Sequence, residues 1–141
     1  MRITKRTNES KEQWYIIDAE NKILGRLACR IANILMGKEK TSYTHDALCG
    51  DFVIVVNADK IKLTGDKLNK KLYTTHSNYP GGFKQKTAGS LLKTNPKYLI
   101  NSAVKGMLPK NKLQDKLMTR LKVYRSTDHP HKAQNPVLLN A

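Results

Sequence analysis

The chain has 141 residues, of which 39% are hydrophobic, and 26 Lys and Arg against 11 Asp and Glu give it a formal net charge of +15. This length and apolar content suffice for one buried core, which excludes a disordered chain and favours a single domain. No apolar run reaches the roughly 18 residues needed to cross a bilayer, and the polar start lacks a signal-type hydrophobic region, so we expect a protein that stays where it is made or has already lost a presequence.

The first half predicts a strand, a helix and a second strand. Residues 14–17 form a short β-prone run, and apolar residues at helical spacing predict a helix over 24–36 that Gly37 ends. The unbroken apolar run 52–56 predicts a strand that is buried on both faces. Together these elements predict a right-handed βαβ unit and therefore the α/β class.

The second half is less regular. We expect a helical turn at 57–60, a turn at 64–66, a strand within 71–76 and a type II turn at 79–82, where Pro precedes Gly. Asn95 and Pro96 are a typical helix start, and this helix should run toward Gly106. A second short helix should start near Asn111, followed by a last strand at 121–124.

The predicted elements divide the chain into three parts. Residues 1–12 are polar and mixed in charge, which indicates an extended arm. Residues 13–125 should form a single α/β domain. Residues 126–141 contain two prolines and should form an extended tail that lies on a surface.

The positive charge lies almost entirely in the second half. Residues 60–141 contain 17 Lys or Arg against 3 Asp or Glu, whereas residues 1–59 contain 9 against 8. Such an excess repels itself unless a multivalent anion neutralises it, and a nucleic-acid backbone is the commonest such anion. The alternative is that the excess lysines only keep the protein soluble, but a net charge of a few units would be enough for that. Because 20 of the 26 cations are Lys, we expect contacts with phosphates more than with base edges.

Two segments concentrate groups that suit RNA. Lys112, Lys116 and Arg120 are spaced four apart, which predicts a row along the outer side of one helix. Residues 76–86 combine hydroxyls, aromatic rings, a glycine pair and two lysines, a composition that suits close approach to a sugar-phosphate chain. A solvated helix face and a plain surface turn are the alternatives, and we prefer phosphate binding because both segments lie in the basic half.

An enzyme is a further alternative. Asp18 and Asn57 should follow adjacent parallel strands, where open α/β sheets commonly bind ligands. The chain has neither the GxGxxG pattern nor a phosphate-binding glycine loop. We therefore expect no catalytic residue and no cofactor.

Histidines and cysteines form no recognisable metal site. His45 and Cys49 lack a second matching pair, and Cys29 falls within the predicted helix, so we expect neither a metal nor a disulfide. Two cysteines without a pairing pattern indicate a reducing compartment, which we take to be the cytoplasm. His129 and His131 we interpret as residues that stack on RNA or donate hydrogen bonds to it.

Several blocks of residues, in this order, resemble the bacterial-type large ribosomal subunit protein thirteen family. They are residues 14–19, 24–28, 50–58, 63–65, 79–82, 104–110 and 129–136. The resemblance implies a three-layer α/β/α domain with a four-stranded, mostly parallel sheet. It also implies binding to large-subunit ribosomal RNA (rRNA), neighbouring large-subunit proteins as partners, a role early in subunit assembly, and no catalysis. His45, Gln114 and Ser126 stand where the family commonly has proline, glycine and glycine.

We therefore expect a structural RNA-binding protein in the ribosome of a bacterium or an organelle, with no membrane and no small-molecule substrate. A free RNA-binding regulator and a basic enzyme that acts on nucleotides are the alternatives. The residues that we expect to contact RNA are Arg26, Arg30, Lys38, Lys40, His76, Ser77, Tyr79, Lys84, Lys86, Lys105, Lys110, Lys112, Lys116, Arg120, His129 and His131.

Overall fold

A computed structural model describes residues 12–139, so nearly all of the expected N-terminal arm lies outside the described residues. The elements are β1 Trp14–Asp18, α1 Leu24–Met36, β2 Phe52–Val56, the 3-10 turn η1 Ala58–Lys60, α2 Lys67–Lys70, β3 Leu72–His76, β4 Phe83–Thr87, α3 Ala88–Thr94, α4 Pro96–Met107, α5 Leu113–Thr119, β5 Leu121–Val123, the 3-10 turn η2 His131–Gln134 and β6 Val137–Leu138.

Four parallel strands form the main sheet, in the order β5-β2-β1-β6. The expected α/β class and the four-stranded sheet are confirmed, and β1, α1 and β2 form the expected strand-helix-strand unit. The prediction that residues 121–124 form the last strand is wrong, because β6 in the tail pairs with β1. The strand β6 has only two residues, which is too short for a sequence pattern to predict it.

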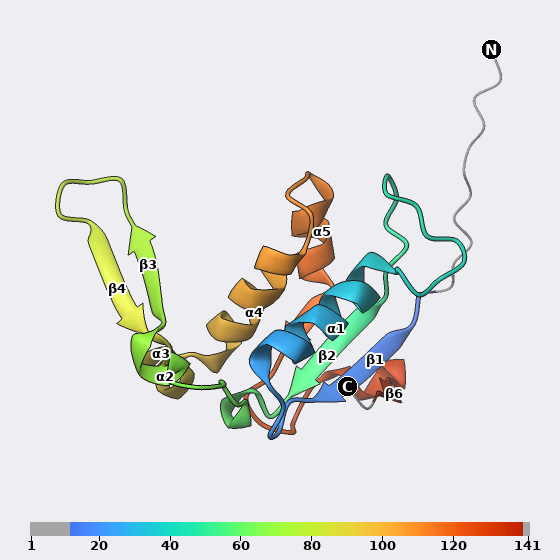
Figure 1. Cartoon of the computed structure of the whole chain (residues 1–141). Helices are drawn as coiled ribbons and strands as arrows, with labels where there is room; N and C mark the ends of the chain where they lie inside the picture. Colours follow the sequence, from blue (N-terminus) through green and yellow to red (C-terminus); the bar gives the residue numbers. More distant parts are fainter. Residues whose placement is uncertain (1–11, 140–141) are drawn as a thin grey trace, which may run out of the picture.

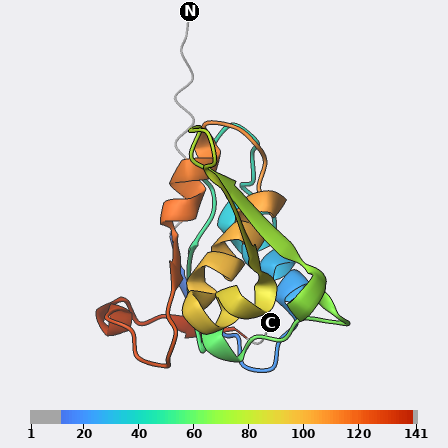
Figure 2. The same cartoon turned by 90° about the vertical axis from the view of Figure 1, so that its left-hand side faces the viewer.

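Helices and the tail cover opposite faces of this sheet (Figures 1 and 2). On one face, α1 buries Leu27, Ile31 and Leu35 in the same core as Val53 and Val55 of β2. The tail, with its turn η2, runs along the other face. Layers on both faces explain why β2 is apolar at every position rather than alternating.

The strands β3 and β4 form an antiparallel hairpin that projects away from the main sheet (Figure 1). Its expected type II turn is confirmed: Gly82 N donates to Tyr79 O over 2.9 Å, and Gly81 has a φ of 72°. A small second core of Ala88, Leu91 and Leu99 anchors its base. The sequence did not predict β4, because residues 83–87 are mostly polar.

The helix α4 begins as expected, since Asn95 Oδ1 accepts a hydrogen bond from Tyr98 N over 3.2 Å. Gln114 of α5 reaches back to the end of α4, where its Nε2 donates to Lys105 O over 2.9 Å and to Leu108 O over 3.3 Å. The Gln114 side chain therefore satisfies carbonyls at a helix end. It fixes the corner between α4 and α5.

Gly50 permits the close approach of β2 to the end of α1. A Cβ atom at Gly50 would lie 1.6 Å from Leu35 O, whereas one at Gly25 would meet no heavy atom within 4 Å. We expect Gly50→Ala to lower the free energy of unfolding by about 3 kcal/mol, measured by urea denaturation, because backbone must move. Gly25→Ala is the matched control and should leave this free energy unchanged or raise it by up to about 1 kcal/mol. Equal stability of the two variants would contradict this packing.

Candidate nucleic-acid interface

The hairpin presents two chemically different faces. Residues directly opposite each other in an antiparallel pair share a face, and successive residues alternate. Lys84 and Lys86 lie opposite Thr75 and Tyr73, so all four share one face. The other face carries apolar and aromatic groups: Leu72, His76 and Phe83.

This hairpin is largely exposed to solvent. The side chains of Tyr79, Phe83 and Leu72 are 75%, 56% and 51% exposed. His76 and Ser77 are also exposed, and the His76 ring accepts a hydrogen bond from Asn78 N. A two-stranded hairpin is only marginally stable alone, so its surface is suited to a partner that covers it.

The corner between α4 and α5 gathers four of the expected lysines. Lys105, Lys110, Lys112 and Lys116 are all exposed. Two of them line a shallow hollow of about 540 Å³, together with Ser102, Gly106, Asn111 and Gln114. Asp115 lies 4.0 Å from Lys105, but both side chains are more than half exposed, so water screens this pair and leaves the corner strongly positive.

Arg120 does not belong to an outward row with Lys112 and Lys116, and that part of the prediction is wrong. It follows the last turn of α5, and its side chain is only 11% exposed. The guanidinium donates to Gly50 O and, over 2.7 Å, to Glu12 Oε1, and it lies 5.2 Å from the ring centroid of Phe52. Arg120 therefore ties β2 to α5, and its contact with RNA stays a prediction.

The two tail histidines pack against aromatic residues of the sheet. The His131 ring lies 5.2 Å from the Trp14 ring, and its Nε2 is 2.8 Å from Tyr124 Oη. Trp14 in turn stacks on Phe52 at 4.3 Å. The His129 ring is 6.4 Å from that of Tyr124. These contacts fasten the tail to the sheet, and stacking of either ring on RNA stays a prediction.

Four expected residues lie on α1 and in the loop after it. Arg26 and Arg30 project from the exposed side of α1, where Arg30 is 3.0 Å from Glu39. Lys38 is exposed, whereas Lys40 lies 2.5 Å from the buried carboxylate of Asp51. Lys40 thus balances a charge inside the fold, because a buried carboxylate needs a partner.

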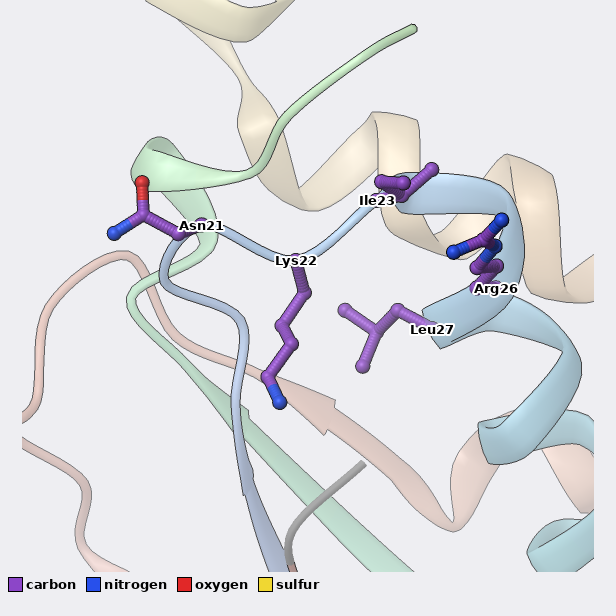
Figure 3. A pocket seen from close by; sticks show the side chains of 5 residues that line it. All are labelled: Asn21, Lys22, Ile23, Arg26 and Leu27. Atoms are coloured by element: carbon purple, nitrogen blue, oxygen red, sulfur yellow. The ribbon is translucent and has the colours of Figure 1, made fainter.

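A cavity of about 290 Å³ lies beside the first turn of α1 (Figure 3). It is lined by Asn21, Lys22, Ile23, Arg26 and Leu27. Figure 3 shows Lys22 extending beside Leu27 while Arg26 projects from the helix. The two cations give this cavity a positive rim.

The interface residues fall into two groups. The hairpin projects to one side of the molecule in Figure 1, whereas α5 follows α4 near the middle of the view and the tail lies on the opposite side from the hairpin. The lysines of the hairpin and those of the α4–α5 corner therefore form two separate exposed groups, on different elements from Arg26, His129 and His131.

Three exposed lysines of α2 and its surroundings were missed by the expected set. Lys67, Lys70 and Lys71 line a hollow of about 430 Å³ with Thr64, Gly65 and Asp66. The three lysines lie within five residues of each other, which could have indicated a basic surface. The helix has only four residues, however, which is too short to show a periodic pattern. They extend the positive surface to the base of the hairpin.

Asp18 and Asn57 meet at the carboxyl ends of β1 and β2, as expected. Asn57 Nδ2 donates to Asp18 Oδ1 over 2.9 Å, and Glu20 N donates to the same oxygen over 2.9 Å. The Glu20 N–H, followed by the Asn57 amide, holds the pKa of Asp18 below its ordinary value. Both groups are thus engaged in joining strand ends, which argues against a catalytic pair.

Residues 12–139 lack the features of two other classes of site. No cluster of three or more His, Cys, Asp and Glu side chains there could hold a metal ion. The helices of this part are all too short or too polar to cross a membrane.

Comparison with known proteins identifies close relatives. The family model for ribosomal protein L13 matches residues 12–130. "Large ribosomal subunit protein uL13" of Brevibacillus brevis is 57% identical over 128 residues, which cover 91% of this chain and 88% of the relative. The protein of the same name from Geobacter sulfurreducens is 52% identical over 142 residues and covers 99% of both chains. The protein of the same name from Thermotoga petrophila is 57% identical over 128 residues, which cover 91% of this chain and 86% of the relative.

The two hydrogen bonds that Asp18 accepts predict a pH-dependent contribution to stability. Asp18→Ala should lower the free energy of unfolding at pH 7 by about 1–2 kcal/mol, because two donors lose an ionised acceptor. The folded-state pKa is lowered, so this contribution is present above the unfolded pKa of about 4 and is lost as the pH falls through the folded value. Urea denaturation at pH 7 and pH 3 should show the difference from wild type shrinking at pH 3. A difference of the same size at both pH values would contradict this role.

Proposed function

This chain belongs to the ribosomal protein L13 family, and from that premise we propose that it is a structural component of the large ribosomal subunit that binds large-subunit rRNA and supports early subunit assembly. One observation carries the proposal for how it binds. The hairpin and the α4–α5 corner both expose lysines, and Asp115 is the only acidic residue in residues 72–87 and 105–116. A folded RNA supplies the dense phosphates that such a surface needs.

Residues 13–125 act as one RNA-binding domain, with residues 126–141 as its tail. The apolar sheet gives the domain a rigid platform, and β6 together with the aromatic contacts of His131 holds the tail to it. Basic elements on a rigid platform can contact separate RNA segments at fixed spacing. Neighbouring large-subunit proteins and a ribosome of bacterial type are the further partners and location that we propose.

Two alternatives differ in what they require. A free RNA-binding regulator would use the same lysines outside the ribosome, so only its location in the cell separates it from a ribosomal component. A nucleotide enzyme would need reactive groups at the strand ends, but Asp18 and Asn57 already bind each other there. Sedimentation of a lysate should place the protein with the large subunit, and a peak at the top of the gradient would favour the regulator.

The lysines of the α4–α5 corner should contribute to the salt dependence of binding. If 6–10 phosphates are contacted, affinity for the rRNA should fall roughly 10³- to 10⁵-fold between 50 and 200 mM salt. The double variant Lys112→Ala, Lys116→Ala should reduce the slope of log affinity against log salt by about two, since each lysine releases about one counterion. Filter binding to protein-free large-subunit rRNA measures this slope.

Arg120→Ala is the contrasting variant. It should lower the free energy of unfolding by about 2–3 kcal/mol, because it removes a largely buried charged donor from Gly50 O. The double lysine variant should keep wild-type stability, because both side chains are exposed. A wild-type salt slope in the double variant, or a flat salt response of the wild type, would contradict the proposed role of these lysines.

A further inference from the structure

We propose that the cavity between the hairpin and the start of α4 binds a single unstacked RNA base. This inference rests on the proposed function and adds a contact with a base to the contacts with phosphates. The cavity measures about 270 Å³. It is lined by Tyr73, Thr75, Lys86, Leu91, Thr94, Asn95 and Tyr98.

Two tyrosines form the aromatic walls of the cavity. The ring centroids of Tyr73 and Tyr98 lie 6.1 Å apart, and their planes meet at 72°. A planar ligand that stacks on one ring therefore presents its edge to the other, an arrangement that aromatic groups favour. Lys71 Nζ already lies 5.4 Å from the centroid of Tyr73, whereas Tyr98 is 38% exposed, so Tyr98 offers the more open face.

Polar groups surround the aromatic walls at the places where a nucleotide needs them. Asn95 uses its side-chain oxygen to cap α4, which leaves its amide N–H groups to donate to a base edge. The Thr75 hydroxyl can donate or accept. Lys86 lies directly opposite Tyr73 on the hairpin, and Lys84 follows on the same face. A base in the cavity would thus place its own phosphate beside two ammonium groups.

Size and chemistry favour a base over other ligands. The volume lies just below the range of about 300–1,000 Å³ that is typical of small-molecule pockets, so it suits one ring system. A bare phosphate would leave the two tyrosines and the buried Leu91 without a role. An acidic peptide would meet the same lysines, but its carboxylate side chains offer no flat ring to stack on Tyr98. Proteins that recognise RNA loops and bulges commonly stack splayed bases on aromatic side chains.

Binding of protein-free large-subunit rRNA by the full-length chain tests the proposal. Tyr98→Leu should weaken binding about 5- to 150-fold at fixed salt, the range expected when one base loses its aromatic platform. The salt slope should fall by no more than about two, because only the ammonium groups of Lys86 and Lys84 lie beside the phosphate of that base. Tyr98→Phe keeps the ring and should bind like the wild type. Tyr43→Leu, on a loop outside the cavity, is the matched control for the loss of one tyrosine and should also bind like the wild type.

The outcomes separate this inference from the proposed function. A wild type that binds the rRNA with a flat salt response overturns the proposed function. A steep wild-type slope together with wild-type affinity of Tyr98→Leu overturns the base site alone. A Tyr98→Leu variant that binds weakly and whose slope falls by clearly more than two also overturns it, because phosphate contacts remote from the cavity would then have been lost.

Photocrosslinking gives a second readout that does not depend on the stability of a truncated side chain. Tyr98 is replaced by p-benzoylphenylalanine in the full chain, and the assembled large subunit is irradiated. The proposal expects a crosslink to one rRNA nucleotide. A crosslink to a protein neighbour, or an assembled subunit without any crosslink from this position, overturns it.

Discussion

The second half of the chain carries more positive charge than its own acidic residues can neutralise, and this excess governs how the protein places its cations. Residues 60–141 hold 17 cations and 3 acids, so contacts within this half can pair only a few of them. The main sheet is largely apolar, and the lysines of the hairpin and of the α4–α5 corner lie outside it in exposed positions. The hairpin and the α4–α5 corner expose lysines, whose mutual repulsion water screens and phosphates would neutralise.

The apolar sheet makes this placement possible. Because β2 is buried on both faces, its position is fixed by α1 on one side and by the tail on the other. Arg120 and Lys40 extend the same framework, since each pairs with a group that β2 or the residues before it supply. Cations in this protein therefore have two roles. Some hold the framework together from inside, and the exposed ones provide the surface that we propose for RNA.

Sequence patterns predicted the elements whose signal is local. The period of α1, the continuous apolar run of β2, the Asn-Pro start of α4 and the Pro-Gly turn of the hairpin all depend on neighbours along the chain. The strand β6 and the role of Arg120 depend on partners far away in sequence: β1 for the strand, and Glu12 and Gly50 for the arginine. Spacing alone cannot tell a solvated cation from one that pairs inside the fold. The pocket of Tyr73 and Tyr98 was missed for the same reason, because its walls come from separate elements.

A density map of the large subunit that contains this protein would show directly whether the exposed lysines meet RNA. We expect the ammonium groups of Lys84, Lys112 and Lys116 to lie within about 4 Å of rRNA phosphate oxygens, the distance at which opposite charges pair. We also expect the apolar sheet to make no RNA contact of its own. A map in which these lysines face open solvent, or in which acidic protein surfaces cover them, would contradict the account.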